Sequence, residues 1–224
     1  IVVDTAREGD RFTTLDGIER KLPEEALMIC DGKGPVALAG IMGGLESEIE
    51  DETTDVLIES AYFHPTTIRR TAKKLGLSTE ASYRFERGID PEGVITAVNR
   101  AAQLICELTG GEAARGIIDN YPKHVPETQI ELSTQATNRL LGTHLKPDTI
   151  SSCLERVELR ASPIDNDRLK ITAPSFRVDL KRPQDLMEEV ARLSGYNRIA
   201  TTHPANQMVP RKQHRKLQIR KQIK

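Results

Sequence analysis

Residues 66–91 have the sequence TTIRRTAKKLGLSTEASYRFERGIDP, and this stretch decides the fold class. It marks the change from strands to helices along the chain. Two helical segments are predicted, over residues 66–75 and 81–87, and they end at Gly76 and Gly88. The chain is therefore expected to combine helices with the strands that precede them.

A longer helix is predicted to begin at Asp90-Pro91, because an acid suits the N-cap and proline suits the first helical position. It runs to the Gly110-Gly111 stop. Apolar residues recur along it at spacings of three and four, which predicts one buried face. These residues are Val94, Ala97, Val98, Ala101, Leu104, Ile105 and Leu108.

The first sixty residues are expected to be rich in strands. Short apolar or β-branched runs lie between glycine and aspartate turns, at residues 1–3, 11–14, 26–30 and 36–38. With the helices that follow, these runs predict a mixed α/β first domain over residues 1–122. A polar, proline-bearing stretch at residues 119–128 is interpreted as a linker.

A second, smaller domain is predicted over residues 123–200. Two short helices, two strands around a polar turn and a third helix follow one another, at residues 133–141, 147–157, 157–161, 169–172 and 183–195. Two helices followed by a hairpin are the outline of a winged-helix-like α+β module. The whole chain is therefore expected to be α+β, with residues 201–224 as a linker and the start of a basic helix.

The composition is that of an ordinary globular chain, with 38% hydrophobic, 4% aromatic and 29% charged residues among 224. No stretch approaches the roughly 20 apolar residues of a membrane helix, and no basic, apolar leader is recognisable. Three separated cysteines without a CxxC pair favour a reducing, cytoplasmic compartment. The first residue is Ile1 rather than methionine, so we expect a piece of a longer polypeptide.

The near-neutral net charge of -1 hides an asymmetry along the chain. Residues 201–224 contain seven basic groups and no acid, which leaves 25 basic against 33 acidic groups, a net charge of -8, in residues 1–200. A mildly acidic body disfavours nonspecific nucleic-acid binding through a broad basic face. The basic tail is interpreted as a solvated helix face or a linker, with phosphate contact as the alternative.

Four acids near the third helix of the second domain are candidate metal ligands. Asp185, Glu188 and Glu189 are spaced i, i+3 and i+4 and therefore share one helix face. Asp179 lies just upstream, and crowded carboxylates suit a hard cation such as Mg2+. The alternative is that acids near a helix N-terminus interact favourably with the macrodipole, by about 0.3–1 kcal/mol each.

A second group of candidate residues lies in the first domain. The glycine-rich segment at residues 40–44 allows a sharp turn or a close approach to a ligand, but no phosphate-loop lysine follows it. Glu59 interrupts the apolar run at residues 56–61, so it must find a partner or line a polar pocket; the alternative is a strand carboxylate that points to solvent. The five histidines are isolated, and no HExxH or GxSxG pattern supports catalysis by them.

Three long segments occur in the order typical of one family. AGIMGGLES at residues 39–47, the run at residues 69–91 that ends in YRFERGIDP, and DLMEEVARLSGY at residues 185–196 resemble the β subunits of bacterial phenylalanine-tRNA synthetases. The similarity covers essentially residues 1–200. It implies part of a ligase that attaches phenylalanine to its tRNA with ATP.

The resemblance implies that the first domain is the C-terminal part of an editing domain, which hydrolyses tyrosine wrongly attached to the phenylalanine tRNA. The matching pocket residues are Gly43, Glu59, Thr79 and Ala81. Glu59 is suited to accept a hydrogen bond from the tyrosine hydroxyl, which phenylalanine lacks. In the family, other pocket residues precede the position of Ile1, so we expect this fragment alone to edit poorly.

The resemblance also implies that the second domain holds Mg2+ at Asp179, Asp185, Glu188 and Glu189, in a site shared with an α subunit. It further implies a heterotetramer of two α and two β subunits that binds tRNA, with ATP and phenylalanine bound by the α subunits. The alternative is a noncatalytic winged-helix module that binds nucleic acid or protein. Binding of DNA by this module is disfavoured, because the third helix carries three acids against a single arginine and would repel phosphate.

Overall fold

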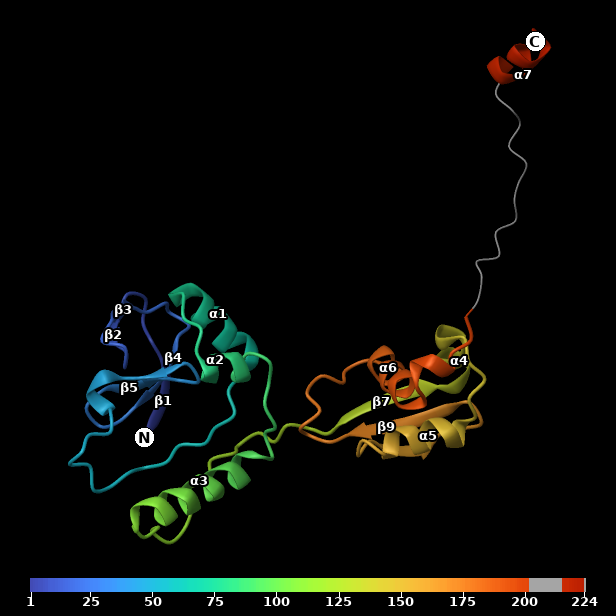
Figure 1. Ribbon diagram of the computed structural model, residues 1–224. Helices are drawn as coiled ribbons and strands as arrows, with labels where there is room; N and C mark the ends of the chain where they lie inside the picture. The colour runs from blue at the N-terminus through green and yellow to red at the C-terminus, as the bar shows by residue number, and fades with distance from the viewer. Residues whose placement is uncertain (202–214, 224) are drawn as a thin grey trace.

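The computed structural model describes residues 1–201 and 215–223, and its first unit is built on an antiparallel sheet (Figure 1). The sheet has the strand order β1-β4-β5-β6, formed by Val2–Thr5, Leu27–Cys30, Pro35–Leu38 and Met42–Gly43. A hairpin pairs β2 (Arg11–Thr13) with β3 (Glu19–Lys21), and the short 3-10 helix η1 (Leu45–Ser47) follows β6. The strand-rich beginning of the chain is therefore confirmed.

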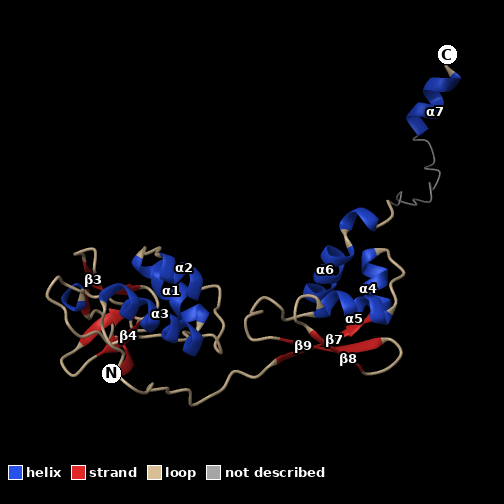
Figure 2. Ribbon diagram, turned by 60° about the horizontal axis from the view of Figure 1, so that its bottom comes forward, coloured by secondary structure: helices blue, strands red, loops and turns tan. Residues whose placement is uncertain are grey.

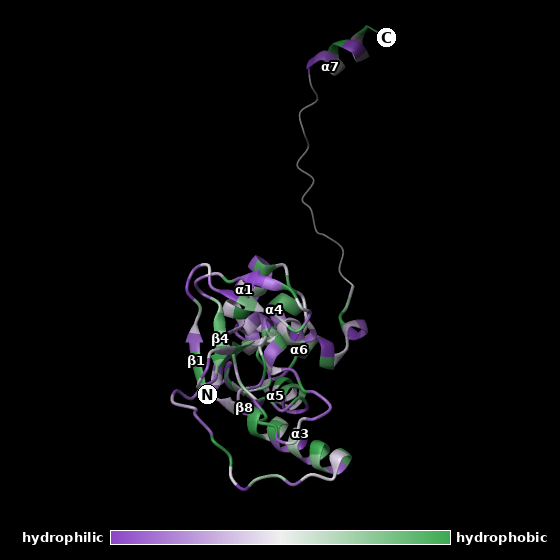
Figure 3. Cartoon of the chain, turned by 90° about the vertical axis from the view of Figure 1, so that its left-hand side faces the viewer, coloured by the Kyte–Doolittle hydropathy of each residue, from purple (hydrophilic) through white to green (hydrophobic). Residues whose placement is uncertain are grey.

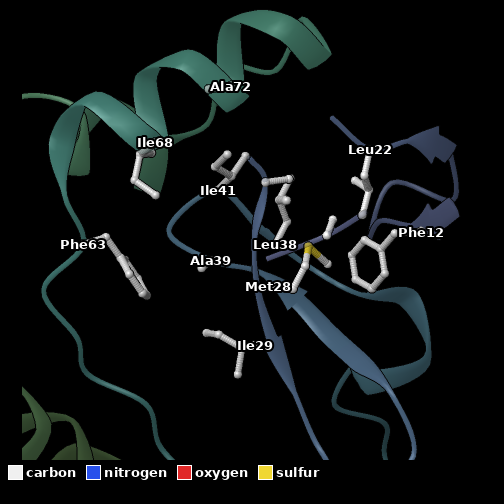
Figure 4. Packing of buried hydrophobic residues seen from close by; sticks show 12 residues of the cluster. Phe12, Leu22, Met28, Ile29, Leu38, Ala39, Ile41, Phe63, Ile68 and Ala72 are labelled. Carbon is white, nitrogen blue, oxygen red and sulfur yellow. The ribbon is translucent and has the colours of Figure 1, made fainter. Parts of the chain in front are cut away.

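Two helices pack on this sheet, α1 (Pro65–Leu75) and α2 (Glu80–Phe85), as the sequence predicts. α1 ends where Gly76 adopts the left-handed conformation, at φ 66°. Figure 4 shows Ile68 and Ala72 on the side of α1 that faces the sheet. They pack in one core with residues of the strands, of the loops around them and of the segment before α1, namely Ala6, Phe12, Leu22, Ala26, Met28, Ile29, Leu38, Ala39, Ile41 and Phe63.

The glycine-rich segment allows the helical layer and the strands to approach closely. Gly40 has φ 66°, and an added Cβ there would lie 2.8 Å from the ring of Phe63. At Gly44 an added Cβ would lie 2.7 Å from the ring of Phe12 and 2.8 Å from the carbonyl oxygen of Val36. Only glycine fits these two positions without a shift of the packed atoms around them.

The third helix, α3 (Val94–Thr109), begins three residues later than Asp90-Pro91 and has Gly93 as its N-cap. Asp90 caps a preceding turn instead, because its side chain accepts a hydrogen bond from the backbone N–H of Glu92 at 3.0 Å. The prediction of a buried face is wrong for the described part of the chain. None of the α3 residues is buried, and Leu108 is 84% exposed, because no described element covers the apolar stripe.

The second unit is a three-stranded antiparallel sheet with helices on one face (Figure 2). In chain order its elements are β7 (Thr128–Ser133), α4 (Thr134–Leu141), α5 (Pro147–Glu155), β8 (Arg160–Pro163), β9 (Arg168–Ala173), α6 (Pro183–Ser194) and the 3-10 helix η2 (Tyr196–Arg198). The sheet order is β7-β9-β8. Its core includes Leu132, Ile150, Leu154, Leu159, Ile171, Leu186 and Val190, which are almost completely buried.

The helices of this unit match their predictions closely, whereas its strands differ. β7 lies beside β9 and was not predicted. β8 begins at Arg160 rather than at residue 157, because Glu158 has φ 64° and closes a turn after α5. The α+β fold class is confirmed, and the domain boundaries at residues 122 and 200 stay predictions.

At the end of the chain, α7 (Arg215–Gln222) agrees with the basic helix expected there. The proline-bearing connector expected after residue 200 falls mainly on residues 202–214, outside the described residues. Among the helices that are described, none combines the length and hydropathy needed to cross a bilayer.

Candidate functional site

Thr79 joins α2 to the strands of the first unit. Its hydroxyl accepts a hydrogen bond from the N–H of Ser82 at 3.0 Å, and its own N–H donates to Ser82 Oγ at 2.9 Å, which completes a capping box. The same hydroxyl donates to the carbonyl oxygen of Ile41 at 2.8 Å. Thr79 therefore fixes the start of α2 against the turn between β5 and β6.

Gly43 lies two residues beyond Ile41, in β6. Its carbonyl oxygen accepts a hydrogen bond from the N–H of Leu15 at 3.0 Å. An added Cβ at Gly43 would meet Leu15 Cδ1 at 3.1 Å, at the end of a side chain that is 42% exposed and free to shift. The stricter requirement for glycine falls on Gly44, which sequence reasoning did not single out and which only packing identifies.

Ala81 is the second residue of α2 and is exposed. The structure thus places Thr79 and Ala81 at the start of α2, and a hydrogen bond joins Thr79 to the turn that leads into β6, where Gly43 lies.

Glu59 lies on a separate segment without regular secondary structure. The neighbouring Ser60 donates a hydrogen bond to the carbonyl oxygen of Val94 at the start of α3, at 2.9 Å. In residues 1–201 the Glu59 side chain forms no hydrogen bond or salt bridge, so the structure does not bond it to the other three candidates. Desolvation raises the pKa of the Glu59 carboxyl, although the residue as a whole remains exposed.

Phe63 connects the segment that contains Glu59 to α2. The Phe63 ring packs against Phe85 of α2, with the ring centroids 5.0 Å apart. Phe63 follows Glu59 by four positions, so the Cα atoms of the two residues lie at most about 14 Å apart. Glu59 is exposed, and it is not in a strand, as the alternative interpretation required.

In the second unit, an arginine lies at the centre of the predicted acidic cluster. Arg177 donates to both carboxylate oxygens of Asp179, at 2.9 and 2.7 Å, and to Glu189 at 2.8 Å. The Arg177 and Glu189 side chains are only 16% and 13% exposed. Arg192 also pairs with Glu189. Sequence reasoning missed Arg177, although a basic residue two positions before Asp179 was a usable signal.

These contacts set the ionisation of the two acids. The hydrogen bond from Arg177 lowers the pKa of Asp179, against the smaller opposing effect of desolvation. For Glu189, desolvation is the largest single influence and raises the pKa, but the hydrogen bonds and charges of Arg192 and Arg177 together outweigh it and lower the pKa. Both carboxylates are therefore held in the charged form.

Asp185 caps the start of α6. Its side chain accepts hydrogen bonds from the backbone N–H groups of Lys181 at 3.0 Å and Arg182 at 2.8 Å, and it pairs with the Arg182 guanidinium at 3.1 Å. The N–H of Lys181, followed by the Arg182 side chain, lowers the pKa of Asp185. This agrees with the helix-terminus alternative. Glu188 is exposed and forms no side-chain hydrogen bond or ion pair within residues 1–201.

In residues 1–201 and 215–223, no three histidine, cysteine or acidic side chains are grouped so that they could hold a metal ion. The donor chemistry nevertheless fits a hard cation, since four carboxylates lie on or just before α6. Asp179 and Asp185 are close enough for the charge of one to raise the pKa of the other. The guanidinium of Arg177 bridges Asp179 and Glu189 and supplies the positive charge that a cation would otherwise bring to these two carboxylates.

Two protein-family models match the chain. The B3/4 domain model matches residues 1–110, which contain the Thr79 cluster and Glu59. The tRNA synthetase B5 domain model matches residues 130–196, which contain the acidic helix α6. These two matches indicate a chain of the tRNA synthetase class that contains a B3/4 and a B5 domain.

Curated relatives identify the particular family. The chain is 49% identical over its whole length to a phenylalanine–tRNA ligase beta subunit of Geobacter metallireducens and 52% identical over 91% of its length to that of Geobacter sulfurreducens. It belongs to the family of phenylalanine–tRNA ligase β subunits. The chain spans 28% and 26% of the lengths of these two relatives.

A solved structure was also found to be similar. It is an N-terminal fragment of the phenylalanyl-tRNA synthetase beta-subunit from Pyrococcus horikoshii, with 17% sequence identity and a TM-score of 0.40. The similarity covers 87% of this chain and 56% of that one.

Proposed function

We propose that this chain is the part of a phenylalanine–tRNA ligase β subunit that removes tyrosine from mischarged tRNA. The observation that carries the proposal is the Thr79–Ile41 hydrogen bond, which holds Thr79 and Ala81 beside the turn leading to Gly43. All three lie in the part of the chain that matches the B3/4 domain. The reaction is ester hydrolysis, in which water releases tyrosine and restores the hydroxyl of the tRNA.

Each pocket residue has a separate role in this proposal. Gly43 presents backbone without a side chain to the aminoacyl group, and Ala81 leaves room for the substrate ring. Thr79 is a positioning residue, because its hydroxyl is already committed to Ser82 and Ile41. Glu59 accepts a hydrogen bond from the tyrosine hydroxyl. Phenylalanine would leave this carboxylate unpaired, and that difference separates the correct from the incorrect product.

The role of Thr79 is tested with two variants in the assembled ligase. Thr79→Val removes the hydroxyl at nearly constant volume, so it should destabilise the start of α2 by about 1 kcal/mol and slow the hydrolysis of tyrosyl-tRNA. Thr79→Ser keeps the cap and should retain the activity. Deacylation rates and thermal melts of both variants are the measurements. Equal deacylation by Thr79→Val and the wild type would contradict the proposal.

The assembled enzyme in this proposal contains two α and two β subunits in the cytoplasm and attaches phenylalanine to tRNA with ATP. The α subunits bind ATP and phenylalanine. The three cysteines of this chain are free thiols, which supports a reducing compartment. Asp179, Asp185, Glu188 and Glu189 form the β-subunit side of a shared Mg2+ site, where the cation would neutralise the facing carboxylates of both subunits.

The metal proposal predicts weak Mg2+ binding by this chain alone, since arginines compete for its carboxylates, and tighter binding once the α subunit is present. Asp185→Asn should weaken Mg2+ binding by the assembled enzyme at least about tenfold. Asp148→Asn, in the first turn of α5, is the matched control and should bind like the wild type. Calorimetric titration measures the affinities. Identical isotherms for Asp185→Asn and wild type would exclude Asp185 as a ligand.

A further inference from the structure

One face of α1 carries four basic residues without a partner in the described chain. Arg69, Arg70, Lys73 and Lys74 are all exposed, and α1 contains no acid. Within residues 1–201 and 215–223, none of the four side chains forms a salt bridge or hydrogen bond. In Figure 3 much of the α1 ribbon is purple, the colour of hydrophilic residues. We call these four residues the α1 basic face.

The α1 basic face differs from the other arginine clusters of the chain. Arg84 of the adjacent α2 pairs with Glu80, and Arg87, just beyond the end of α2, pairs with Glu86. Arg177 pairs with two acids in the second unit. In a chain with 33 acids, four neighbouring cations without one opposing carboxylate are a local exception. Their charge is therefore available to an external anion.

Helix stability accounts for only part of this pattern. Lys73 and Lys74 lie in the last turn of α1, where cations interact favourably with the helix macrodipole. Arg69 and Arg70 lie in the middle of the helix and gain nothing from that interaction, which falls off within one turn. At about 100° per residue, the four cations lie opposite Ile68 and Ala72, which face the core (Figure 4).

The spacing along α1 suits a phosphate backbone. The pair Arg69 and Arg70 and the pair Lys73 and Lys74 are four residues apart, a rise of about 6 Å. This is comparable to the distance between adjacent phosphates along a nucleic-acid strand. Lysine and arginine bind phosphates through charge without reading the base sequence.

The position of α1 links this face to the candidate editing pocket. α1 packs over Ile41, whose carbonyl oxygen bonds Thr79, and Thr79 follows Lys74 by only five residues. We propose that the α1 basic face binds the phosphate backbone of the tRNA acceptor end and guides the aminoacylated terminus toward the pocket. The inference rests on the proposed editing function for the identity of the RNA and extends it to a binding surface.

Binding of uncharged tRNA tests this surface independently of hydrolysis. Fluorescence anisotropy with the 224-residue chain should give weaker binding for the Lys73→Ala/Lys74→Ala double variant, by several-fold at low salt. The slope of log K against log salt concentration should become shallower by about 1.5, the value for two lost phosphate contacts. Alanine is a good helix former, so α1 should persist, and circular dichroism checks this.

The matched control is Lys33→Ala/Lys123→Ala, which removes the same charge from two exposed lysines outside α1. It should leave the salt slope close to that of the wild type. A double variant in α1 that keeps the affinity and slope of the wild type would overturn the proposal. The proposal is equally overturned if both double variants lose the same affinity, because the effect then belongs to net charge.

The editing reaction separates this surface from the pocket. In the assembled ligase, Lys73→Ala/Lys74→Ala should raise the KM for tyrosyl-tRNA several-fold and leave hydrolysis of tyrosyl-adenosine, which has no upstream phosphates, unchanged. Glu59→Ala should instead slow the hydrolysis of both tyrosyl-tRNA and tyrosyl-adenosine and leave the affinity for tRNA unchanged. If the wild-type enzyme hydrolyses neither ester, the editing function fails, and the salt-slope result still decides whether α1 binds RNA.

Discussion

Glu59→Ala in the assembled ligase is expected to abolish the preference for hydrolysing tyrosyl-tRNA over phenylalanyl-tRNA. Loss of a hydrogen bond between the tyrosine hydroxyl and a charged carboxylate costs about 1.5–3 kcal/mol, so the rate on tyrosyl-tRNA should fall about 10- to 100-fold. The variant no longer leaves an acid unpaired beside phenylalanine, so its rate on that ester should not fall. The measurement is the ratio of the deacylation rates of tyrosyl-tRNA and phenylalanyl-tRNA.

The pH dependence distinguishes this role from a general loss of structure. Desolvation raises the pKa of the Glu59 carboxyl above its ordinary value of 4.5. The charged acceptor is present above that raised pKa and is lost as the pH falls through it. Wild-type selectivity should therefore decline at a higher pH than an ordinary glutamate would give, and the Glu59→Ala ratio should be independent of pH over the same range.

Glu52→Ala is the control for Glu59→Ala. It removes an exposed acid from the same irregular segment. Its deacylation ratio should match that of the wild type. If Glu59→Ala retains full selectivity while folding normally, recognition of the tyrosine hydroxyl lies elsewhere.

Helices were the most predictable part of the fold, because their ends have local signals. Gly76, Gly110 and Gly142 each adopt the left-handed conformation immediately after a predicted helix. Proline at the first position of α5 and α6 fixed their beginnings equally well. The same signal misplaced the start of α3, since an aspartate before proline also suits a turn.

Strands depended more on distant partners and were harder to predict. β3 is Glu-Arg-Lys, with no apolar residue to suggest a strand, and it is held by pairing with β2 and by the ion pair of Arg11 with Glu19. β7 borders a predicted linker, and its inward residues, Ile130 and Leu132, gain their environment from β9 and the core. When a strand pairs with a partner 30 or more residues away, its own sequence contains little local signal of that pairing.

The candidate sites show the same division. The spacing of Asp185, Glu188 and Glu189 predicted a shared region on one helix, and α6 forms as expected. Single-helix spacing could not show that arginines from the preceding loop and the helix itself bind two of these acids. Likewise, the segment AGIMGG indicated a close approach but not that Gly44 faces a packed ring and a carbonyl oxygen.

The second large effect is expected for Arg177→Met, which should destabilise the second unit by about 2 kcal/mol. Breaking a buried ion pair typically costs about 3–5 kcal/mol, but Arg192 remains beside Glu189 and part of the cluster is solvated. Methionine retains much of the apolar stem of arginine, so the loss of stability measures the contribution of the guanidinium group. Urea denaturation followed by circular dichroism measures the change.

Arg168→Met is the matched control for Arg177→Met. Arg168 pairs with Asp165 and Glu131, but all three side chains are about half exposed. Surface pairs of this kind contribute little to stability because solvent screens them, so this variant should be nearly as stable as the wild type. Equal stability of Arg177→Met and Arg168→Met would show that the Arg177 cluster contributes no more than an ordinary surface pair.

The difference between wild type and Arg177→Met should depend on pH in a defined direction. Arg177 contributes to lowering the pKa values of Asp179 and Glu189 from their ordinary values of 3.8 and 4.5. The stability that these acids contribute is complete above those ordinary values and is lost as the pH falls through the lowered ones. The two proteins should therefore differ fully at pH 7, and the difference should shrink only as the pH falls below these ordinary values and through the lowered pKa values.

Mg2+ should reduce the difference in stability between the wild type and Arg177→Met. Without the guanidinium, the charges of Asp179 and Glu189 repel each other, and a divalent cation restores the missing positive charge. Mg2+ should therefore stabilise Arg177→Met more than the wild type, in which Arg177 competes for both acids. A variant that is destabilised but gains nothing from Mg2+ would show that these acids serve the ion-pair network and not a metal.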